Sequence, residues 1–361
     1  MKKKRVIAFY LPQYHPFPEN DEWWGKGFTE WTNVAKARPL FKGHYQPHLP
    51  ADLGFYDLRV PEVREQQAEM AKKYGIDGFC YYHYWFNGHQ LMQRPLEEVL
   101  SLGKPDFPFM LCWANENWTR AWDGEQKDVL IKQIYNEDDD RKHIQYLLDN
   151  VFLDPRYIKV DGKPVFCVYR SNLLPDMGRT IHIWREEAMK QGVELYLCRV
   201  ESFNSAGEKY LQDGFDAAIE FQPFTPYMKT FIKAKSPICK FIYNLNRHFF
   251  NRCKKRKVDY AAYVEYTSKL PTPNYRLYPC VTPMWDNTSR RIQKMFILSD
   301  STPEKYGNWL SSVMRKFKPF SEQENFVFIN AWNEWAEGNH LEPDAKWGSQ
   351  YLEETKKAVE N

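Results

Sequence analysis

The chain has 361 residues, of which 27% are charged and 43% are hydrophobic, and its formal net charge is +3. This composition is typical of a soluble globular protein, and so small a net charge does not favour a nucleic-acid-binding function. Barrels that alternate strands and helices reach this length as one domain, so we expect a single domain over residues 1–361.

The N-terminal sequence MKKKRVIAFYLPQYHP opens with basic residues, but its apolar stretch is too short for a signal peptide and ends in Pro and His. No run of 18 apolar residues occurs, so no membrane span is expected. The seven cysteines are scattered without CxxC spacing, which favours buried apolar positions over disulfides or metal ligands. We therefore expect a cytoplasmic protein that needs no cofactor.

Strand-like and helix-like segments alternate along the chain. The apolar runs lack strict alternation, as expected for parallel strands buried on both faces. They are residues 5–11, 76–85, 107–113, 164–170, 195–201, 217–221, 278–284 and 326–332. Helix-like stretches that open at Pro or an acidic residue lie between most of them, at 61–74, 138–151, 176–191 and 303–317. The alternation predicts an α/β fold, a (β/α)8 barrel, and no glycine-rich phosphate loop supports a doubly wound sheet instead.

Two segments are longer than a minimal barrel needs. Residues 20–53 are rich in aromatic residues and follow the first strand. The second is a basic insertion at about 225–275, in which residues 233–257 hold nine Lys or Arg and no acidic residue. A solvated helical hairpin is the simplest interpretation, and a patch for an anionic glycan, a nucleotide-linked donor or a peripheral membrane surface is the alternative.

Polar and aromatic residues gather where the predicted strands end. Active sites of such barrels are built by the loops at the carboxyl ends of the strands. The aromatic content of 17% also suits stacking on sugar faces, although ordinary core packing explains most single rings. The expected substrate-binding residues are Tyr10, His15, His83, Tyr84, Trp113, Asn115, Glu116, Trp118, Glu220, Trp285, Trp332, Asn333 and Trp335.

Glu334 and Glu337 lie in the segment NAWNEWAEG at 330–338. Carboxylates three residues apart face opposite sides of a continuous strand, so they cooperate only if the chain turns between them, as Gly338 suggests. In a helical turn their Cβ atoms would be about 5–6 Å apart, a spacing that leans toward retaining glycosidases. Neighbouring Trp332 and Trp335 would raise the pKa of one carboxyl and leave it protonated as a general acid. A capping or salt-bridging role is the structural alternative.

Other candidates carry weaker signals. Glu116 suits either a sugar hydroxyl or a buried ion pair. The histidines His15, His83 and His340 lack HxxxH or HxH spacing, so no metal site is expected. The acidic run Asp138–Asp140 opens a predicted helix and is expected to stabilise its N-terminus.

Long motifs resemble the WbsX-like family, often called glycosyltransferase WbsX, which is related to glycoside hydrolase family 99. They are AFYLPQYHPFPENDEWWGKGFTEWTNV at 8–34, GIDGFCYYHYWFNG at 75–88, CWANENWTRAWDG at 112–124, GKPVFCVYR at 162–170 and NAWNEWAEGNHLEPD at 330–344. The blocks span nearly the whole chain. The resemblance implies a (β/α)8 barrel, in agreement with the strand pattern.

The resemblance also implies a chemical mechanism. Family 99 enzymes are retaining endo-acting α-mannosidases or mannanases whose catalytic motif is similar to the segment 334–338. By that similarity, Glu334 is the base for the sugar 2-hydroxyl, which forms a 1,2-anhydro intermediate, and Glu337 is the general acid and then the base for water. This chain has Ala336 where family 99 has His, so the resemblance does not extend to substrate identity.

Three functions fit these features. The first is a retaining glycoside hydrolase for a bacterial surface polysaccharide of the O-antigen or capsule type, or its lipid-linked precursor. The second is a glycosyltransferase in lipopolysaccharide or capsule biosynthesis, because WbsX-like members are placed with such pathways. The third is a non-catalytic glycan-binding barrel. In each case an oligosaccharide or polysaccharide is the expected ligand.

Overall fold

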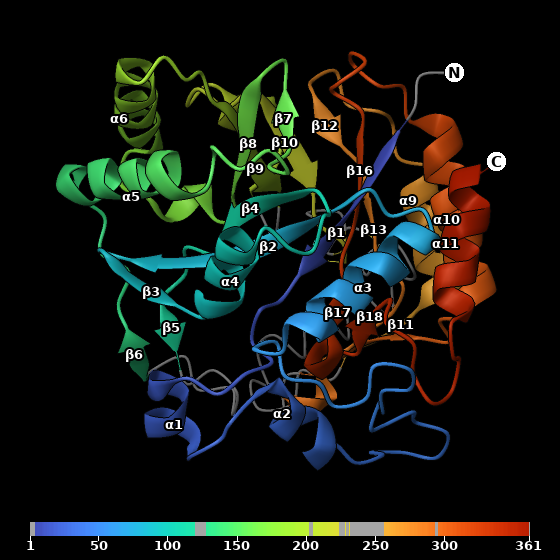
Figure 1. Ribbon diagram of the computed structural model, residues 1–361. Coiled ribbons are helices and arrows are strands. Elements are labelled where there is room, and N and C mark those ends of the chain that lie inside the picture. The colour runs from blue at the N-terminus through green and yellow to red at the C-terminus, as the bar shows by residue number, and fades with distance from the viewer. Residues whose placement is uncertain are drawn as a thin grey trace, which may run out of the picture.

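The computed structural model describes residues 4–119, 128–201, 205–223, 228, 231, 256–292 and 295–360. Parallel strands form a nearly closed barrel with helices around it (Figure 1). Its strands, in chain order, are β1 (Arg5–Tyr10), β2 (Gly78–Phe86), β4 (Phe109–Trp113), β8 (Lys163–Val168), β9 (Tyr196–Glu201), β10 (Ala217–Glu220), β12 (Leu277–Tyr278), β13 (Cys280–Val281) and β16 (Phe326–Ile329). The predicted barrel and the strands expected in it are confirmed.

The barrel closes through a strand that is broken at one residue. β12 pairs with β10 and β13 pairs with β16, and only Pro279 separates the two short strands. Proline has no N–H to donate to a ladder, but the Pro279 carbonyl still accepts a hydrogen bond from Phe328 N at 2.8 Å. The run predicted at 278–284 is therefore two short strands that share the closure of the barrel.

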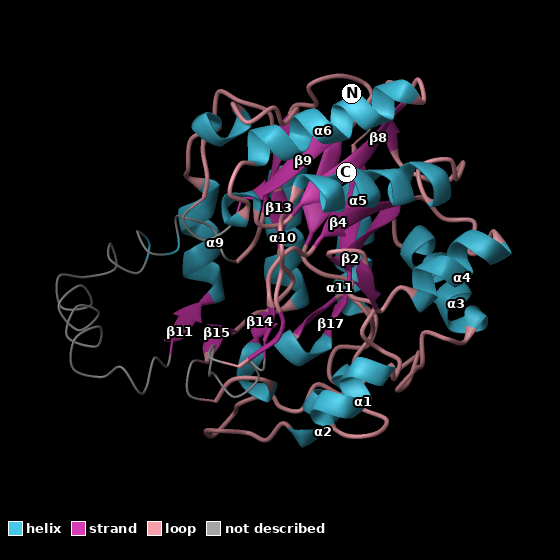
Figure 2. Cartoon of the chain, turned by 90° about the vertical axis from the view of Figure 1, so that its left-hand side faces the viewer, coloured by secondary structure: helices cyan, strands magenta, loops and turns pink. Residues whose placement is uncertain are grey.

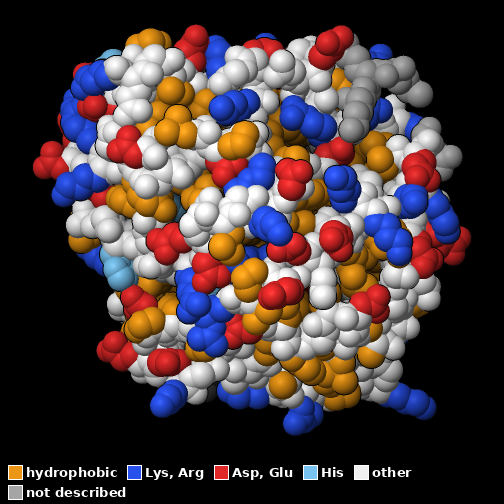
Figure 3. All heavy atoms as spheres, viewed as in Figure 1, with side chains coloured by type: hydrophobic (Ala, Val, Ile, Leu, Met, Phe, Trp, Pro, Cys, Tyr) orange, Lys and Arg blue, Asp and Glu red, His pale blue; other side chains and the backbone are white. Residues whose placement is uncertain are grey.

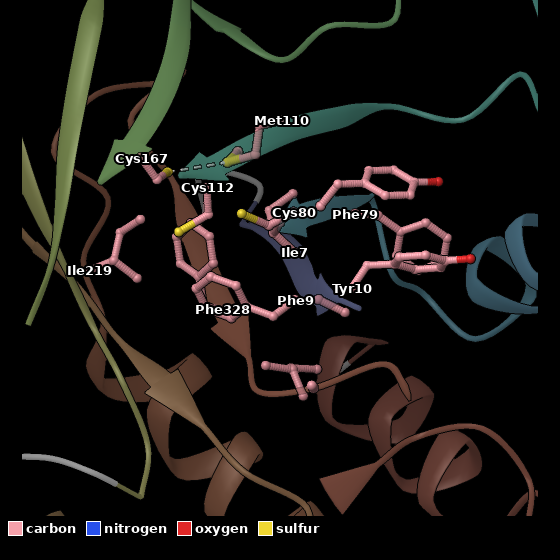
Figure 4. Close-up of a cluster of buried hydrophobic side chains, with 14 of the residues drawn as sticks. Ile7, Phe9, Tyr10, Phe79, Cys80, Met110, Cys112, Cys167, Ile219 and Phe328 are labelled. Atoms are coloured by element: carbon pink, nitrogen blue, oxygen red, sulfur yellow. Dashed lines mark hydrogen bonds between the residues drawn. The ribbon is translucent and has the colours of Figure 1, made fainter. Parts of the chain in front are cut away.

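Both faces of the barrel strands are buried, which explains why their sequences do not alternate in polarity. Successive side chains nevertheless point to opposite faces. On β1, the ring centroid of Phe9 lies 5.5 Å from that of Phe328 inside the barrel. The ring centroid of Tyr10 lies 5.1 Å from that of Phe79 on the outside (Figure 4). The described cysteines are all buried and free, and Cys80 is among those in the interior shown in Figure 4.

Helices surround the barrel, with α3 and α4 on one side and α9 on the opposite side (Figure 2). They are α3 (Pro61–Lys73), α4 (Arg94–Leu102), α5 (Glu137–Asn150), α6 (Met177–Lys190), α9 (Tyr260–Ser268), α10 (Pro303–Lys316) and α11 (Gln350–Glu360). Side-chain caps begin several of them; for example, Asn136 accepts a hydrogen bond from Asp139 N at 2.9 Å. The acidic run at 138–140 lies in the first turn of α5, as the sequence predicts.

Short elements cover the end of the barrel at which β1 ends (Figure 1). The long segment 20–53 supplies most of α1 (Pro18–Trp24) and all of α2 (Glu30–Lys36). Beside α2 lie η5 (Trp335–Glu337) and η4 (Asn287–Ser289), and η5 connects the paired strands β17 (Asn333–Glu334) and β18 (Asn339–His340). The remaining elements are β3 (His89–Leu91), β5 (Trp118–Thr119), β6 (Val129–Ile131), β7 (Lys159–Val160), β11 (Arg256–Asp259), β14 (Trp285–Asp286), β15 (Phe296–Ser299), η2 (Ser171–Leu173) and η3 (Glu208–Leu211).

Most of the predicted basic stretch, residues 233–257, lies outside the described residues, and only its last two belong to β11. Acidic and basic side chains are interspersed over the face shown in Figure 3. Within the described ranges, no helix is both long and apolar enough to cross a bilayer. The single-domain assignment stays a prediction.

Candidate active site

Arg290 gathers three glutamates at the covered end of the barrel. It follows η4, and its Nη2 donates to Glu30 Oε2 on α2 at 2.6 Å. Its Nη1 donates to Glu337 Oε1 at 2.9 Å, and Nη2 lies 3.5 Å from Glu334 Oε2. Glu334 and Glu337 therefore contact one guanidinium, which holds the two carboxyl groups close together.

The turn expected between the two glutamates is present. Glu334 ends β17, η5 turns the chain, and Gly338 adopts a φ of +53° before β18 returns antiparallel to β17. A Cβ atom on Gly338 would lie 2.8 Å from Asp286 O, so only glycine lets the turn approach β14 this closely. The close approach brings η5 beside η4, which leads into Arg290.

Burial sets the charges of these carboxyls. The Glu30 side chain is 0% exposed, that of Glu334 is 9% exposed, and that of Glu337 is 26% exposed. Burial, with repulsion from Glu337 and Glu30 that outweighs the attraction of Arg290, raises the pKa of Glu334 to about 8. Burial also raises the pKa of Glu30, although Arg290 opposes that shift. At neutral pH the unliganded site thus holds a proton on Glu334.

A hydrogen-bonded framework fixes the β17–β18 hairpin from behind. Asn333 accepts from Leu11 N at 2.7 Å and donates to Leu11 O at 3.0 Å, which ties the hairpin to the end of β1. Trp335 stacks on His340 with ring centroids 3.7 Å apart and donates to Glu342 Oε2 at 2.6 Å. Asn333 and Trp335, both predicted to bind substrate, are used here to hold the hairpin in place.

Aromatic rings lie next to the carboxyls. Tyr84 and Tyr82 on β2 point into the barrel end, and the charge of Glu334 helps to raise the pKa of both, after the larger effect of burial. Trp118 packs edge-on against Tyr84 with centroids 5.4 Å apart, and Tyr169 packs edge-on against Tyr82 at 6.2 Å. These four side chains are partly exposed, so the predicted residues Tyr84 and Trp118 are placed where a sugar face could stack.

Glu116 lies at the same end of the barrel. It forms an ion pair with Arg170, and it is close enough to Glu337 for their charges to repel. Asn115 positions this arginine, since its side chain accepts from Arg170 N at 2.8 Å and donates to Arg170 O at 3.0 Å. Glu116 is accessible to a ligand, whereas Asn115 is buried as a support.

Four of the predicted residues are not brought to the Arg290 cluster. The Tyr10 hydroxyl donates to Gln67 Oε1 on α3 at 2.7 Å, and His83 Nε2 lies 3.0 Å from His143 Nε2 on α5. Trp113 packs against Trp184 on α6 with centroids 5.8 Å apart, and His15 is buried with Nδ1 3.0 Å from Pro12 O. Tyr10, His83 and Trp113 occupy strand positions whose side chains face the surrounding helices rather than the barrel interior.

Three further predicted residues also lie apart from the cluster. Glu220 lines a separate cavity of about 630 Å³ that is also lined by β12 and α10. Trp285 lines a smaller cavity of about 140 Å³ together with His44. Trp332 packs on Phe79 outside the barrel with centroids 5.1 Å apart.

Glu30 and Arg290 are the site residues that the sequence did not reveal. Glu30 lies in the motif FTEW of the long segment 20–53, and Arg290 lies four residues after Asp286. The resemblance in the N-terminal motif was the available signal for Glu30. Nothing local marks Arg290, because its partner Glu30 is 260 positions away in the sequence.

A family model described as Glycosyltransferase WbsX matches residues 6–355. The chain belongs to the WbsX glycosyltransferase family. It is 42% identical over 358 residues to "Uncharacterized protein WxcX" from Xanthomonas campestris pv. campestris strain ATCC 33913, covering 98% of this chain and 49% of that protein. The strain B100 protein of the same name matches equally, at 42% identity with 98% and 49% coverage. This WbsX-family chain thus spans about half the length of these relatives.

Solved structures share its fold. A glycoside hydrolase family 99 endo-α-mannosidase from Bacteroides thetaiotaomicron superposes with a TM-score of 0.59 and 15% identity, covering 100% of this chain and 98% of that one. A "Glycoside hydrolase-like protein" superposes with a TM-score of 0.61 and 14% identity, over 99% and 94% of the two chains. At such low identity these likenesses establish the barrel and not the reaction.

Proposed function

We propose that the chain is a carbohydrate-active enzyme, a retaining glycoside hydrolase that uses Glu334 and Glu337 as its acid/base pair. The observation that carries the proposal is that both carboxyls contact the guanidinium of Arg290 beside partly exposed aromatic rings at the carboxyl end of the barrel. Two carboxyl groups held close together, with rings for a sugar face beside them, are the equipment of glycoside cleavage.

In the first step the sugar 2-hydroxyl gives its proton to Glu334 and its oxygen attacks the anomeric carbon, while Glu337 protonates the departing oxygen. This forms the 1,2-anhydro sugar that the family resemblance implies. A base with a pKa of about 8 removes a proton from a hydroxyl more effectively than an ordinary carboxylate. In the second step Glu337 takes a proton from water as the water opens the three-membered ring, and Glu334 returns its proton to the 2-oxygen.

The unliganded site holds its proton on Glu334, so the proton must leave this residue before the first step. A bound 2-hydroxyl that donates a hydrogen bond to Glu334 stabilises its ionised form. In this mechanism the proton passes to the neighbouring Glu337, whose carboxyl contacts the same guanidinium. Substrate binding thereby sets the two protonation states that catalysis needs.

The proposed substrate is a bacterial surface polysaccharide of the O-antigen or capsule type, or its lipid-linked precursor. A glycosyltransferase that builds such a polysaccharide is the second candidate, and the name of the family favours it. The two reactions differ in whether water or a sugar hydroxyl accepts the glycosyl group, and the same acid/base pair serves both.

Incubation with polysaccharide fragments, with and without nucleotide-sugars, tests this choice. Hydrolysis predicts shorter products that keep their anomeric configuration and need no donor, whereas chain growth that requires a nucleotide-sugar would overturn hydrolysis. Glu337→Gln should lower kcat by about 10²–10⁴-fold and leave glycan binding intact. Glu62→Gln, an exposed position on α3, is the matched control and should retain full activity. Wild-type activity in the Glu337 variant would remove the pair from the mechanism.

Aryl glycosides assign the two roles. A leaving group of low pKa departs without protonation, so such substrates should restore the first step of Glu337→Gln but not of Glu334→Gln. The wild-type kcat/KM should fall as pH rises through about 8, because the single proton that the free site holds on Glu334 and passes to Glu337 is then lost to solvent. Rescue of the Glu334 variant instead would reverse the assignment.

A further inference from the structure

Three buried side chains outside the Arg290 cluster lie close together. His48 comes from the loop after α2, His340 belongs to β18, and Asp344 follows β18. They are 4%, 1% and 2% exposed. Imidazole nitrogens and a carboxylate oxygen are the ligand types that divalent transition metals take from proteins.

The ligand atoms have the spacing of a metal site. His48 Nδ1 lies 3.0 Å from His340 Nε2, and His340 Nε2 lies 3.8 Å from Asp344 Oδ2. The three atoms all lie within 4.8 Å of one another. Two ligands of a tetrahedral Zn²⁺ are about 3.3 Å apart, because each bond is about 2.0–2.2 Å long. Small side-chain shifts therefore suffice to bring all three atoms to one ion.

Hydrogen bonds already orient these groups for an ion. His340 Nδ1 donates to Glu342 O at 2.9 Å, which leaves the Nε2 lone pair directed at His48. Asp344 Oδ1 accepts from the backbone N–H groups of Lys346 at 2.9 Å and Trp347 at 2.6 Å. The other oxygen of Asp344 faces the histidines. Such outer contacts fix the tautomer and orientation of metal ligands.

The cluster also holds a buried carboxylate oxygen whose hydrogen bonding is incomplete. Asp344 Oδ2 has no hydrogen bond of good geometry among the described residues, although the side chains of Asp344 and Tyr45 are close enough to form one. A buried carboxylate oxygen is costly unless the Tyr45 hydroxyl, an ion or solvent satisfies it. Tyr45 and His48 also line the cavity of about 140 Å³, so the cluster borders a space that small ligands can enter.

A second buried histidine pair provides the contrast. His83 and His143 also approach through ring nitrogens at 3.0 Å, but rings pack around them, with Trp85 stacked on His143 at 4.7 Å. No other group of three potential ligands meets the same spacing in the part of the chain that the structure describes. A histidine pair alone is thus ordinary packing here, and Asp344 is what distinguishes the first cluster.

We propose that His48, His340 and Asp344 bind a divalent transition metal of the Zn²⁺ class. The ion links the loop after α2, which supplies His48, to the β17–β18 hairpin, which supplies His340. This is the hairpin that carries Glu334 and Glu337, and His340 pairs with Asn333 across it. The sequence did not suggest this site, since 292 positions separate the two histidines. It is independent of the proposed glycosidase chemistry.

Direct Zn²⁺ binding tests the proposal. The 361-residue chain, freed of metal by dialysis against a chelator, should bind one Zn²⁺ in competition with a chromophoric chelator and should unfold at a higher temperature when loaded. Asp344→Asn and His48→Gln should each weaken binding at least about 100-fold, since even outer contacts of metal ligands are worth 10–100-fold. His83→Gln, which alters the contrasting pair, should leave Zn²⁺ affinity unchanged.

Co²⁺ identifies the ligands. Co²⁺ bound by nitrogen and oxygen ligands should give visible absorption bands, and loss of these bands in Asp344→Asn supports the site. A thiolate charge-transfer band would instead place the metal on cysteine and overturn the proposal. The wild-type chain makes the test independent of how the variants fold. Absence of saturable one-to-one Zn²⁺ binding to it, or affinity unaffected by both Asp344→Asn and His48→Gln, refutes the proposal.

Discussion

Replacing Arg290 by glutamine should destabilise the protein at neutral pH because it removes the positive charge that three glutamates share. Glu30 is the residue most affected, since its carboxyl is fully buried and Arg290 donates to it through both Nε and Nη2. Without the arginine, Glu30 avoids a buried charge by holding a proton.

The size of this effect follows from the cost of that proton. A glutamate has an ordinary pKa of 4.5, so keeping it protonated at pH 7 costs about 3 kcal/mol at about 1.4 kcal/mol per pH unit. Breaking a buried ion pair by removing one partner costs about 3–5 kcal/mol in other proteins. Because burial already raises the pKa of Glu30 with Arg290 present, part of this cost exists in the wild type, and we expect Arg290→Gln to lower the free energy of unfolding by about 1–3 kcal/mol at pH 7.

Urea unfolding measured from pH 4.5 to pH 8 checks this reasoning. A raised folded-state pKa of a carboxyl destabilises the fold increasingly as pH rises above the unfolded value, and has no effect well below it. The deficit of Arg290→Gln should thus be largest at high pH and nearly absent at about pH 4.5. The double variant Glu30→Gln/Arg290→Gln should recover part of the loss at pH 7, because it removes the buried acid as well.

An exposed ion pair provides the control. Arg59 and Asp57 are 39% and 32% exposed, so Arg59→Gln should change stability by no more than about 0.5 kcal/mol. A loss below about 1 kcal/mol in Arg290→Gln, a loss independent of pH, or no recovery in the double variant would refute the account of Arg290 as the charge partner of buried Glu30.

Three further changes test the site. Glu334→Gln should stabilise the fold by up to a few kcal/mol above pH 8 and have little effect below about pH 4.5, because burial raises the pKa of Glu334 to about 8. Unfolding curves that show equal effects at both ends of the pH series would contradict this expectation. Gly338→Ala should lower the free energy of unfolding by more than about 2 kcal/mol, because the new Cβ atom would lie 2.8 Å from Asp286 O. Gly348→Ala has a similar φ of +52° but open surroundings, so it should lower the free energy of unfolding by about 1–2 kcal/mol. Thermal unfolding of both variants compares the two effects. Trp118→Ala should raise KM for a bound glycan by about 2- to 12-fold with kcat nearly unchanged, and steady-state kinetics that show only a kcat effect would exclude a stacking role.

Local sequence patterns were sufficient to predict the barrel and the turn between Glu334 and Glu337. The runs at 5–11 and 326–332 are apolar without alternation because both faces of their strands are covered, and this pattern predicts buried parallel strands. The turn between Glu334 and Glu337 was also readable, since Gly338 adopts a conformation that other residues disfavour. These features depend on interactions within a few residues.

The inward or outward direction of the strand residues was not readable in the same way. His83 and Tyr84 are neighbours in an aromatic strand, yet the first contacts His143 on α5 and the second points toward Glu334. A strand with one solvent-exposed face has alternating polar and apolar residues that indicate which side chains point inward. A barrel strand between the core and the surrounding helices has no such alternation. For this reason several rim residues predicted to bind substrate lie on the side that faces the helices.

The sequence by itself determined the order of strands and helices, the tight turn at Gly338 and the residue types available for chemistry. Only the tertiary structure decided that Glu30 meets Arg290, 260 positions later, and that His48 meets His340, 292 positions later. Closure of the barrel brings the loops from distant strands to one end, and no periodicity along the chain records which of their side chains then touch.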